Sequence, residues 1–286
     1  MRHILITSKH SYIGCQLEKW IRIREKEWEV DCLSVRNMDF ENMDFSKYDA
    51  VVHVAALVHQ REKPDMWDQY YKSNVVLTAK LAKKAKQDGV TCFLFMSSMS
   101  VYGMEEGHIT IATEPNPKSF YGKTKWMAEQ EVMKLADDKF QVAVVRPPMV
   151  YGEGCPGNYK RLSKLVEIIP VFPKVDNQRS MIYVGNLCEL LGQIIKKRQQ
   201  GLFMPQNKTY ITTNELVAEI ARVRGKKMFE TVIGVRFINS FKHRVSLLQK
   251  VFGGLTYDKD ISQYDGIAYQ NVGLRESIEL AETVGE

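Results

Sequence analysis

A tyrosine and a lysine stand four residues apart in the run Tyr121-Gly122-Lys123-Thr124-Lys125, a spacing that places both side chains on one face of a helix. A free tyrosine has a pKa near 10 and is a poor base at neutral pH, but a neighbouring ammonium group favours the phenolate and lowers that pKa. Such a pair can take a proton from a hydroxyl group as hydride leaves the adjacent carbon, or return it. The sequence therefore predicts acid–base catalysis of hydride transfer by Tyr121 and Lys125.

Two further motifs follow apolar runs directly. Residues 97–103, Ser-Ser-Met-Ser-Val-Tyr-Gly, follow the run 92–96, and residues 146–152, Arg-Pro-Pro-Met-Val-Tyr-Gly, follow the run 142–145. The carboxyl ends of parallel strands meet at one edge of a sheet, where ligands bind. We expect the serine hydroxyls of the first motif to hold a reacting oxygen there. The alternative is a serine-rich turn without a function.

A turn between the apolar run 4–6 and a helical pattern from residue 13 is suited to a dinucleotide pyrophosphate, because N–H groups at a helix start bind phosphate. The turn, residues 7–14, reads Thr-Ser-Lys-His-Ser-Tyr-Ile-Gly and keeps only the last glycine of the pattern Thr-Gly-x-x-Gly-x-x-Gly. Serine at positions 8 and 11 adds a Cβ that could weaken or reshape phosphate binding, and a hydroxyl that could donate to it.

The residues after the second apolar run bear on which dinucleotide fits. They are Ser34-Val35-Arg36, with no carboxylate before Asp39. An acidic residue at this position binds the ribose 2′-hydroxyl of NAD, whereas an arginine accommodates the 2′-phosphate of NADP. Arg36 therefore favours NADP(H). The alternative is that Arg36 is an ordinary solvated cation of a loop.

Alternating strands and helices must position these residues. Apolar runs near 4–7, 30–35, 50–55, 92–96 and 142–145 alternate with helical patterns near 13–21, 65–86 and 121–135. This order predicts an α/β fold, a Rossmann-like doubly wound parallel sheet with helices on both faces. We expect residues 1–152 to form the NAD(P)-binding domain, to which the chain returns at about 179–200 through a strand at 181–184 and a helix at 187–195. Residues 153–286 are expected to form mainly a smaller substrate-binding lid.

Composition excludes several classes of protein. The 286 residues are 44% hydrophobic and 26% charged, which is typical of a folded globular chain, and no apolar run is long enough to span a membrane. Five widely spaced cysteines without a Cys-x-x-Cys pair predict neither a disulfide framework nor a metal site. The net charge of +6 comes without a dense basic run, so we expect a phosphate-bearing small molecule rather than nucleic acid. The short apolar run at residues 4–6 predicts no signal peptide, hence a cytoplasmic protein.

Residues 226–248 are both apolar and basic, as are helices that lie on membrane surfaces. The interrupted apolar pattern is more typical of a helix pair packed within the lid, so membrane association is not expected.

Taken in order, these motifs resemble the extended short-chain dehydrogenase/reductases, specifically the NAD-dependent epimerase/dehydratase family of nucleotide-sugar enzymes, which includes UDP-glucose 4-epimerase-like proteins. The resemblance covers most of the chain and rests on residues 7–14, His-Val-Ala-Ala at 53–56, Lys-Ser-Asn at 72–74, and the motifs at 97–103, 121–125 and 146–152.

The resemblance implies a role for each motif. Ser98 is expected to be the catalytic hydroxyl, Tyr121 the acid or base, and Lys125 the residue that binds the nicotinamide ribose and tunes the tyrosine. Besides Tyr121 and Lys125, NAD or NADP is expected to contact Thr7, Ser8, Ser11, Tyr12, Ile13, Gly14, Arg36, Ala55, Ala56, Asn74 and Pro147. The substrate, a nucleotide-diphosphate sugar, is expected to contact Ser98, Ser100, Asn158 and Arg179, the last gripping phosphate through its forked guanidinium.

The resemblance also narrows the reaction. Dehydratases of this family carry an Asp-Glu pair after the catalytic hydroxyl, where this chain has Met99-Ser100, so elimination of water is not expected. The expected reaction is epimerisation at C4 of a UDP-hexose or UDP-N-acetylhexosamine through a 4-keto intermediate. One alternative is NAD(P)H-dependent reduction of a UDP-deoxyamino 4-keto sugar, and another is a dinucleotide-binding sensor without catalysis. The helices near 65–86 and 121–135 are those through which relatives form homodimers.

Overall fold

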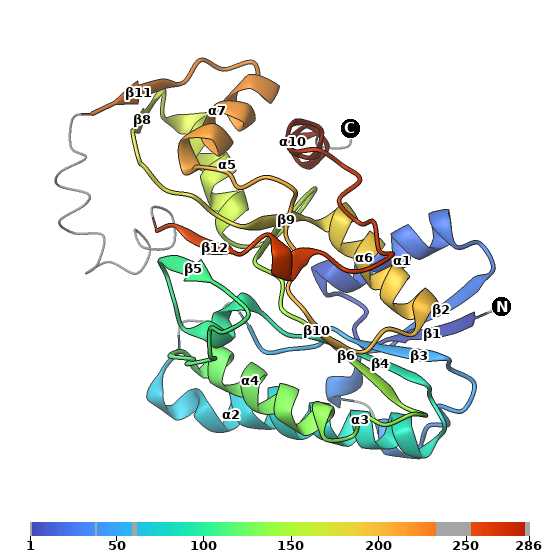
Figure 1. Cartoon of the computed structure of the whole chain (residues 1–286). Coiled ribbons are helices and arrows are strands. Elements are labelled where there is room, and N and C mark those ends of the chain that lie inside the picture. Colours follow the sequence, from blue (N-terminus) through green and yellow to red (C-terminus); the bar gives the residue numbers. More distant parts are fainter. Residues whose placement is uncertain (1, 38, 59–61, 233–252, 284–286) are drawn as a thin grey trace.

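The computed structural model describes residues 2–37, 39–58, 62–232 and 253–283 (Figure 1). Most of the apolar and basic stretch 226–248 therefore lies outside the described residues. Within the described part of the chain, no helix is both long enough and apolar enough to cross a membrane.

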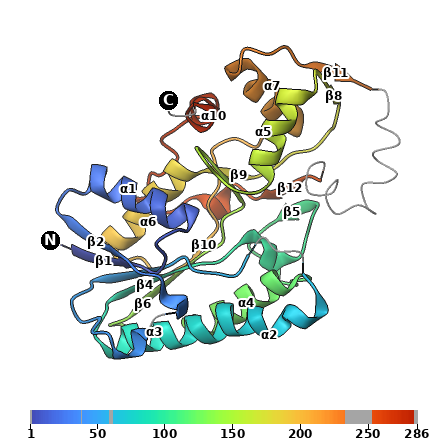
Figure 2. The same cartoon turned by 180° about the vertical axis from the view of Figure 1, so that it is seen from behind.

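Six parallel strands form the central sheet, in the spatial order β10-β6-β4-β3-β1-β2. They are β1 (Arg2–Ile6), β2 (Trp28–Cys32), β3 (Ala50–His53), β4 (Cys92–Met96), β6 (Gln141–Val145) and β10 (Gly201–Phe203). Helices α1 (Tyr12–Arg24) and α6 (Val184–Lys197) cover one face, and α2 (Trp67–Tyr71), α3 (Leu77–Gln87) and α4 (Phe120–Met133) cover the other (Figures 1 and 2). The predicted doubly wound α/β fold is confirmed.

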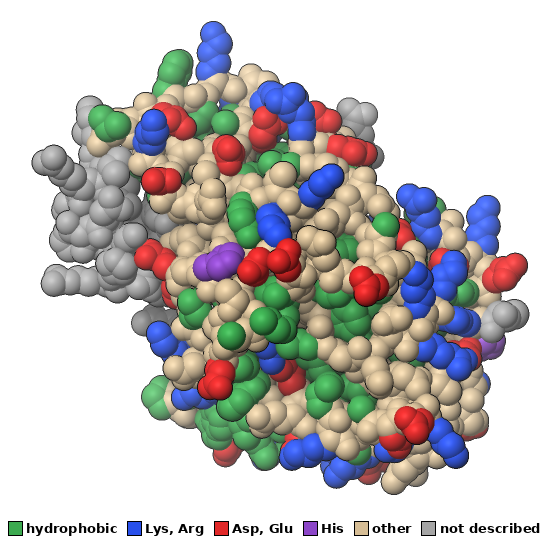
Figure 3. Space-filling model, viewed as in Figure 1, with side chains coloured by type: hydrophobic (Ala, Val, Ile, Leu, Met, Phe, Trp, Pro, Cys, Tyr) green, Lys and Arg blue, Asp and Glu red, His purple; other side chains and the backbone are tan. Residues whose placement is uncertain are grey.

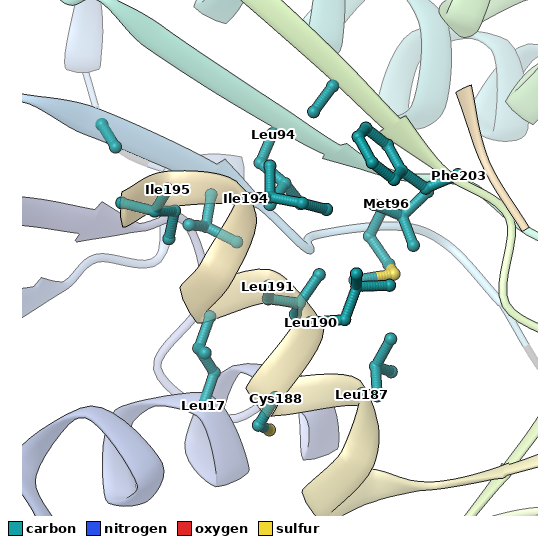
Figure 4. Close-up of a cluster of buried hydrophobic side chains, with 14 of the residues drawn as sticks. Leu17, Leu94, Met96, Leu187, Cys188, Leu190, Leu191, Ile194, Ile195 and Phe203 are labelled. Atoms are coloured by element: carbon teal, nitrogen blue, oxygen red, sulfur yellow. The ribbon is translucent and has the colours of Figure 1, made fainter. Parts of the chain in front are cut away.

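Both faces of the sheet are buried because successive side chains of a strand point to opposite sides. In β1, Ile4 and Ile6 pack with α1 and α6, whereas Leu5 between them packs with α3 and α4, and all three are fully buried. Figure 4 shows the first of these cores, where leucines and isoleucines of α6 meet Leu94 and Met96 of β4 and Phe203 of β10. Continuous apolar strands are what such two-sided burial requires.

The predicted return strand at 181–184 does not join the central sheet. Residues Met181–Tyr183 form β9, which pairs with β7 (Met149–Tyr151) in a separate two-stranded sheet, and β10 is the sixth strand of the main sheet. Pro147 and Pro148 lie between β6 and β7, and prolines, which lack an N–H, cannot continue a hydrogen-bonded ladder. The chain therefore leaves the sheet there. The predicted helix at 187–195 is present within α6 and packs on the sheet.

The second half packs around a core of its own. It contains α5 (Asn158–Ile168), α7 (Thr213–Val223), α10 (Leu274–Glu282) and the strand pair β8 (Val171–Pro173) and β11 (Phe229–Thr231). Helix α7 begins with a capping box, in which Thr212 and Glu215 each bond the other's backbone N–H. One strand of this half, β12 (Leu255–Tyr257), pairs with β5 (Gly107–Ile109), which lies between β4 and α4 in sequence.

Candidate active site

Two separate caps fix the start of α4, where Tyr121 lies. The Ser119 hydroxyl accepts a hydrogen bond from Gly122 N at 3.0 Å. The two carboxylate oxygens of Glu62 accept from Phe120 N at 2.9 Å and from Tyr121 N at 3.0 Å. A negative group at a helix start is favourable because it faces unpaired N–H groups and the positive end of the helix dipole. The backbone of Tyr121 is therefore held in place before any ligand arrives.

The serine motif lies directly against this helix. A Cβ on Gly122 would stand 2.6 Å from the carbonyl oxygen of Ser100, so only glycine allows this close approach. Ser98 caps the short 3-10 helix η5 (Met99–Tyr102), and its Oγ accepts from Ser100 N at 3.1 Å and from Ser100 Oγ at 3.0 Å. Since a hydroxyl has one proton to give, the Ser98 proton is left to donate to another group. Ser98, Ser100 and Tyr121, three predicted site residues, come together here.

The pKa of Tyr121 differs from what the sequence predicts. Burial raises it to about 12, an interaction with the Ser98 hydroxyl opposes the rise, and Tyr70 adds to it. The expected lowering of this pKa by Lys125 is not seen in the protein alone. The physical reason is that desolvation, which disfavours a phenolate, outweighs the neighbouring groups.

Lys125 is an unusually buried lysine. Its side chain is 1% exposed, and Nζ lies 4.2 Å from the centroid of the Phe95 ring. Burial lowers the pKa of Lys125 to about 7, and the charge of Glu129 opposes this change. Among the described residues, Nζ donates no hydrogen bond, so its three protons are available to a ligand.

Asn74 joins the loop after β3 to α4. It lies in the π-helical turn η4 (Lys72–Val76), and such turns are frequent at functional sites. Its Oδ1 accepts from Leu57 N at 2.7 Å, and its Nδ2 donates to Leu57 O at 3.2 Å and to Thr124 Oγ1 at 3.0 Å. Its amide thereby fixes the loop containing the predicted cofactor contacts Ala55 and Ala56.

His53 is a structural residue. Its Nδ1 lies 2.7 Å from Thr7 Oγ1 and its Nε2 lies 2.8 Å from Thr78 Oγ1. Because Thr78 gives its own proton to Asn74 O, Nε2 must be the protonated nitrogen, and Nδ1 accepts from Thr7. Burial lowers the pKa of His53 to about 3, with Lys125 adding to the effect, so the ring is neutral. The side chain of Thr7, a predicted cofactor contact, is occupied by this bond.

The serine-substituted turn is closed by its own hydroxyls. Ser11 caps α1 by accepting from Gly14 N at 3.1 Å, and Ser8 Oγ accepts from Ser11 N at 3.0 Å. Both serines act as acceptors, so both keep a proton to donate. Within the described chain, the N–H groups of Tyr12 and Ile13 have no acceptor. Two hydroxyls and two N–H groups at a helix start fit the diphosphate of a dinucleotide.

Gly14 and Arg36 complete this end. A Cβ on Gly14 would meet Ser11 Oγ at 2.5 Å and side-chain carbons of Ile6 and Val54 at 3.2 Å, so glycine is needed for α1 to pack on the sheet. Arg36 is exposed, and its guanidinium donates to the carbonyl oxygen of Ala56. This bond places the cation beside the ends of β2 and β3. Pro147 is buried, and its carbonyl accepts from Met99 N at 2.9 Å.

The two predicted residues of the second half are placed differently. Arg179 Nε donates to Gly253 O at 2.7 Å, and burial lowers its pKa to about 10, an effect that Glu105 of the 103–107 loop opposes. Arg179 thus faces the loop that follows the serine motif. Asn158 is the first residue of α5, and its side chain makes no hydrogen bond with the described residues.

The chain is similar in sequence to proteins of a known family. The profile described as "NAD dependent epimerase/dehydratase family" matches residues 16–203. The chain belongs to this family. UDP-glucose 4-epimerase of Vibrio cholerae is 31% identical over 264 residues, which cover 82% of this chain and 79% of the relative. The N-acetyl-alpha-D-glucosaminyl-diphospho-ditrans,octacis-undecaprenol 4-epimerase of Escherichia coli O157:H7 is 28% identical over 201 residues, covering 68% of this chain and 60% of the relative.

Solved structures share the fold. UDP-glucuronic acid 4-epimerase from Bacillus cereus in complex with NAD superposes with a TM-score of 0.72 at 18% identity, covering 98% of this chain and 95% of that chain. A dTDP-4-dehydrorhamnose reductase from Clostridium acetobutylicum superposes with a TM-score of 0.65 at 24% identity, covering 80% and 82%. The predicted membership of the family is confirmed. The relatives and structural neighbours include both epimerases and reductases of sugar nucleotides.

Sequence reasoning missed two features of this site. Glu62 has no motif around it, and only the fold brings it to α4. The second is a buried ion pair between Glu129 and Arg146. The four-residue spacing from Lys125 places Glu129 on the same helix face, but no local pattern indicates its pairing with Arg146.

Proposed function

We propose that the chain catalyses NAD(P)-dependent epimerisation at C4 of a UDP-hexose or UDP-N-acetylhexosamine through a 4-keto intermediate. The observation that carries the proposal is the meeting of Ser98 and Tyr121 on the side of α4 that also presents the buried Lys125. The name of the Vibrio cholerae relative, UDP-glucose 4-epimerase, supports chemistry at C4.

Each residue of the site has a proposed role in the reaction. Tyr121 removes the proton of the C4 hydroxyl and later returns it, while the Ser98 hydroxyl donates to the reacting oxygen. Lys125 in its charged form stabilises the phenolate, which burial alone disfavours. Arg179, whose pKa of about 10 keeps it charged at neutral pH, binds the diphosphate of the sugar nucleotide.

The turn at residues 7–14 would hold the cofactor. The N–H groups of Tyr12 and Ile13 and the hydroxyls of Ser8 and Ser11 would bind its diphosphate. Bound NAD or NADP supplies the acceptor and donor of the hydride. Arg36, held beside Ala56, supports a preference for NADP through the 2′-phosphate.

Reduction of a UDP-deoxyamino 4-keto sugar is the second candidate. An epimerase keeps its cofactor bound through the cycle, whereas a reductase must exchange it after each turnover. The loss of two glycines from the turn and the presence of Arg36 favour exchange of NADP(H), which is what a reductase needs. Dehydration is not proposed, because Met99 and Ser100 offer no carboxylate to carry the proton.

One experiment separates the two reactions. Purified protein is incubated with UDP-glucose and with UDP-N-acetylglucosamine without added cofactor, and the products are examined for the C4 isomer. Conversion is expected for an epimerase. If both sugars remain unchanged, and NADPH is consumed only when a UDP-linked 4-keto sugar is supplied, the reductase is correct. Absence of both activities contradicts the proposal.

We also propose a homodimer formed through the α2, α3 and α4 face. Tyr71 is 36% exposed and Met133 is 41% exposed on these helices, and Figure 3 shows hydrophobic side chains gathered over α4 in the lower left. Light scattering coupled to size-exclusion chromatography is expected to give twice the chain mass of 33.0 kDa. A monomeric mass would contradict it.

A further inference from the structure

A buried ion pair lies one helical turn beyond Lys125. Glu129 of α4 is 4% exposed and Arg146, which follows β6, is 7% exposed. Arg146 Nη2 donates to Glu129 Oε2 at 2.6 Å, and Nε lies 3.0 Å and 3.2 Å from the two carboxylate oxygens. Such forked contacts fix the orientation of both groups.

Three hydroxyl groups form hydrogen bonds with Glu129 or Arg146. The Ser97 hydroxyl donates to Glu129 Oε1. Arg146 Nη1 donates to the Tyr102 hydroxyl at 2.8 Å, and the Tyr257 hydroxyl donates to the backbone carbonyl of Arg146 at 2.9 Å. Burial opposes the charge of Arg146, but its hydrogen bond and charge interaction with Glu129 outweigh this and raise its pKa. The carboxylate of Glu129 is therefore held in one position by Arg146 and Ser97.

Lys125 lies one helical turn from this carboxylate. Tyr121, Lys125 and Glu129 follow each other at intervals of four residues, so all three lie on one face of α4. Of the other groups against Lys125, Phe95 of β4 is apolar and His53 of β3 is neutral because its pKa is lowered to about 3. Burial disfavours the ammonium form, and Glu129 is the charge that favours it.

We propose that Glu129 is a positioning residue for the catalytic pair, and that its carboxylate keeps Lys125 in the charged form beside Tyr121. Arg146 and Ser97 serve this role by holding the carboxylate where Lys125 is influenced by it without a direct hydrogen bond. Direct pairing would occupy the ammonium protons, which a ligand needs. The effect of Glu129 on the ionisation of Lys125 does not depend on the proposed function, and only its consequence for catalysis rests on that function.

The direct test measures the ionisation of Lys125 without any substrate. Protein carrying 13C at the lysine ε-carbon is titrated by NMR, and the Lys125 signal is assigned by its loss in Lys125→Met. Exposed lysines titrate near 10.4, so a buried lysine is well separated from them. We expect Glu129→Gln to lower the Lys125 midpoint by about one pH unit, the scale of a lost opposite charge nearby.

Matched variants separate charge from packing. Glu129→Asp retains the charge and is expected to restore most of the midpoint, although the shorter side chain weakens its contact with Arg146. Glu131→Gln, on the same helix, removes an exposed carboxylate paired with Lys134 at 2.8 Å and is expected to leave the midpoint unchanged. If Glu129→Gln does not fold because Arg146 is left unpaired, Glu129→Gln with Arg146→Met removes both buried charges, and the lowered midpoint is expected to persist.

The outcome that overturns the proposal is a Lys125 midpoint unchanged in Glu129→Gln, or in the double variant, while thermal stability falls. In that case Glu129 serves only to attach α4 to the end of β6.

The catalytic consequence is measured as the pH dependence of kcat/KM with UDP-glucose or UDP-N-acetylglucosamine, whichever is converted. A rate that needs the Lys125 ammonium is present below its pKa and is lost as pH rises through it, so Glu129→Gln moves the alkaline limb to lower pH. Absence of turnover in the wild type contradicts the proposed function and leaves the titration result valid.

Discussion

The two ends of the candidate site are built by different means. At the turn after β1, the groups facing a ligand are backbone N–H groups and serine hydroxyls, which carry no charge and lie on a partly exposed surface. On α4, the groups of interest include Lys125 and, one helical turn further on, Glu129, both almost completely buried. Backbone groups can bind phosphate whatever side chains surround them, so we expect the turn to bind phosphate with serine in place of glycine. Proton transfer depends on particular side chains and their environment. The residues that the family resemblance implies for this step, Ser98, Tyr121 and Lys125, are all present.

The largest expected effect is at the buried end. Tyr121→Phe removes the phenol and is expected to lower kcat by about 10²- to 10⁴-fold, the usual contribution of general acid–base catalysis. The Kd for NAD(P) is expected to change little, because we expect the turn after β1 to bind the diphosphate. Tyr71→Phe is the control, because it removes only a hydroxyl group and keeps the ring on the α2 surface proposed for the dimer. Wild-type turnover by Tyr121→Phe would show that the α4 end does not depend on this side chain for catalysis. A dinucleotide-binding sensor would then be favoured over an enzyme.

The next effect concerns the one glycine that the turn retains. Gly14→Ala places a Cβ 2.5 Å from Ser11 Oγ and is expected to destabilise the protein by about 1–3 kcal/mol through overpacking. Cofactor affinity is expected to fall by about tenfold or more, since α1 must move away from its place. Thermal unfolding and cofactor titration measure both. The control is Gly273→Ala, because nothing lies within 4 Å of a Cβ built there. Equal behaviour of the two variants would show that the turn does not need its glycine.

A smaller effect is expected from the single charged residue proposed for the cofactor end. Arg36→Ala is expected to raise the Kd for NADPH by about tenfold, the scale of one charge-assisted hydrogen bond, and to leave the Kd for NADH nearly unchanged. Arg24→Ala, an exposed arginine in the last turn of α1, controls for overall charge. Equal losses for NADH and NADPH would contradict the proposed recognition of the 2′-phosphate.

The smallest effect is expected at the serine cap. Ser11→Ala removes the bond to Gly14 N and is expected to cost about 1 kcal/mol, whereas Ser11→Gly costs only a few tenths. For a chain of this size the alanine variant should lower Tm by about 2–4 °C. Differential scanning calorimetry checks the order of the three proteins. If the glycine variant also binds NAD(P) more tightly than the wild type, Ser11 weakens phosphate binding at the turn. The departure of this end from the family pattern would then have a measurable effect on the cofactor.

The sequence predicts those parts of this molecule that depend on short spans of chain. Strands β1, β3, β4 and β6 follow from continuous apolar runs, and the Tyr121–Lys125 pair follows from helical spacing. Strand β2 (Trp28–Cys32) instead alternates with charged residues and begins two residues before the expected run at 30–35. Features that depend on distant partners carry no local pattern. The Glu62 cap reaches 58 and 59 residues along the chain, and β10 has only three residues, too few for an apolar run to show.

Ionisation is the least predictable property. The sequence predicts that Tyr121 and Lys125 are neighbours on one helix face. It does not predict how deeply they are buried, and burial raises the pKa of Tyr121 and lowers that of Lys125. The burial comes from segments distant in sequence that pack on α4 only in the folded protein, among them η4, η5 and Phe95 of β4. A charge pattern in a sequence therefore indicates which groups interact, and the fold decides which effect is larger.

The pairing of β12 with β5 has a consequence for biosynthesis. His108 and Thr256, whose side chains meet at 2.8 Å across these strands, are 148 residues apart in the chain. As a ribosome releases the nascent polypeptide from its N-terminus, the central sheet can assemble early, yet the loop beside the serine motif has no partner strand until residues 255–257 have emerged. Contacts between such distant residues form late because closing a long loop costs entropy. The β5–β12 pair can therefore form only after residues 255–257 have been synthesised, well after the strands of the central sheet can fold.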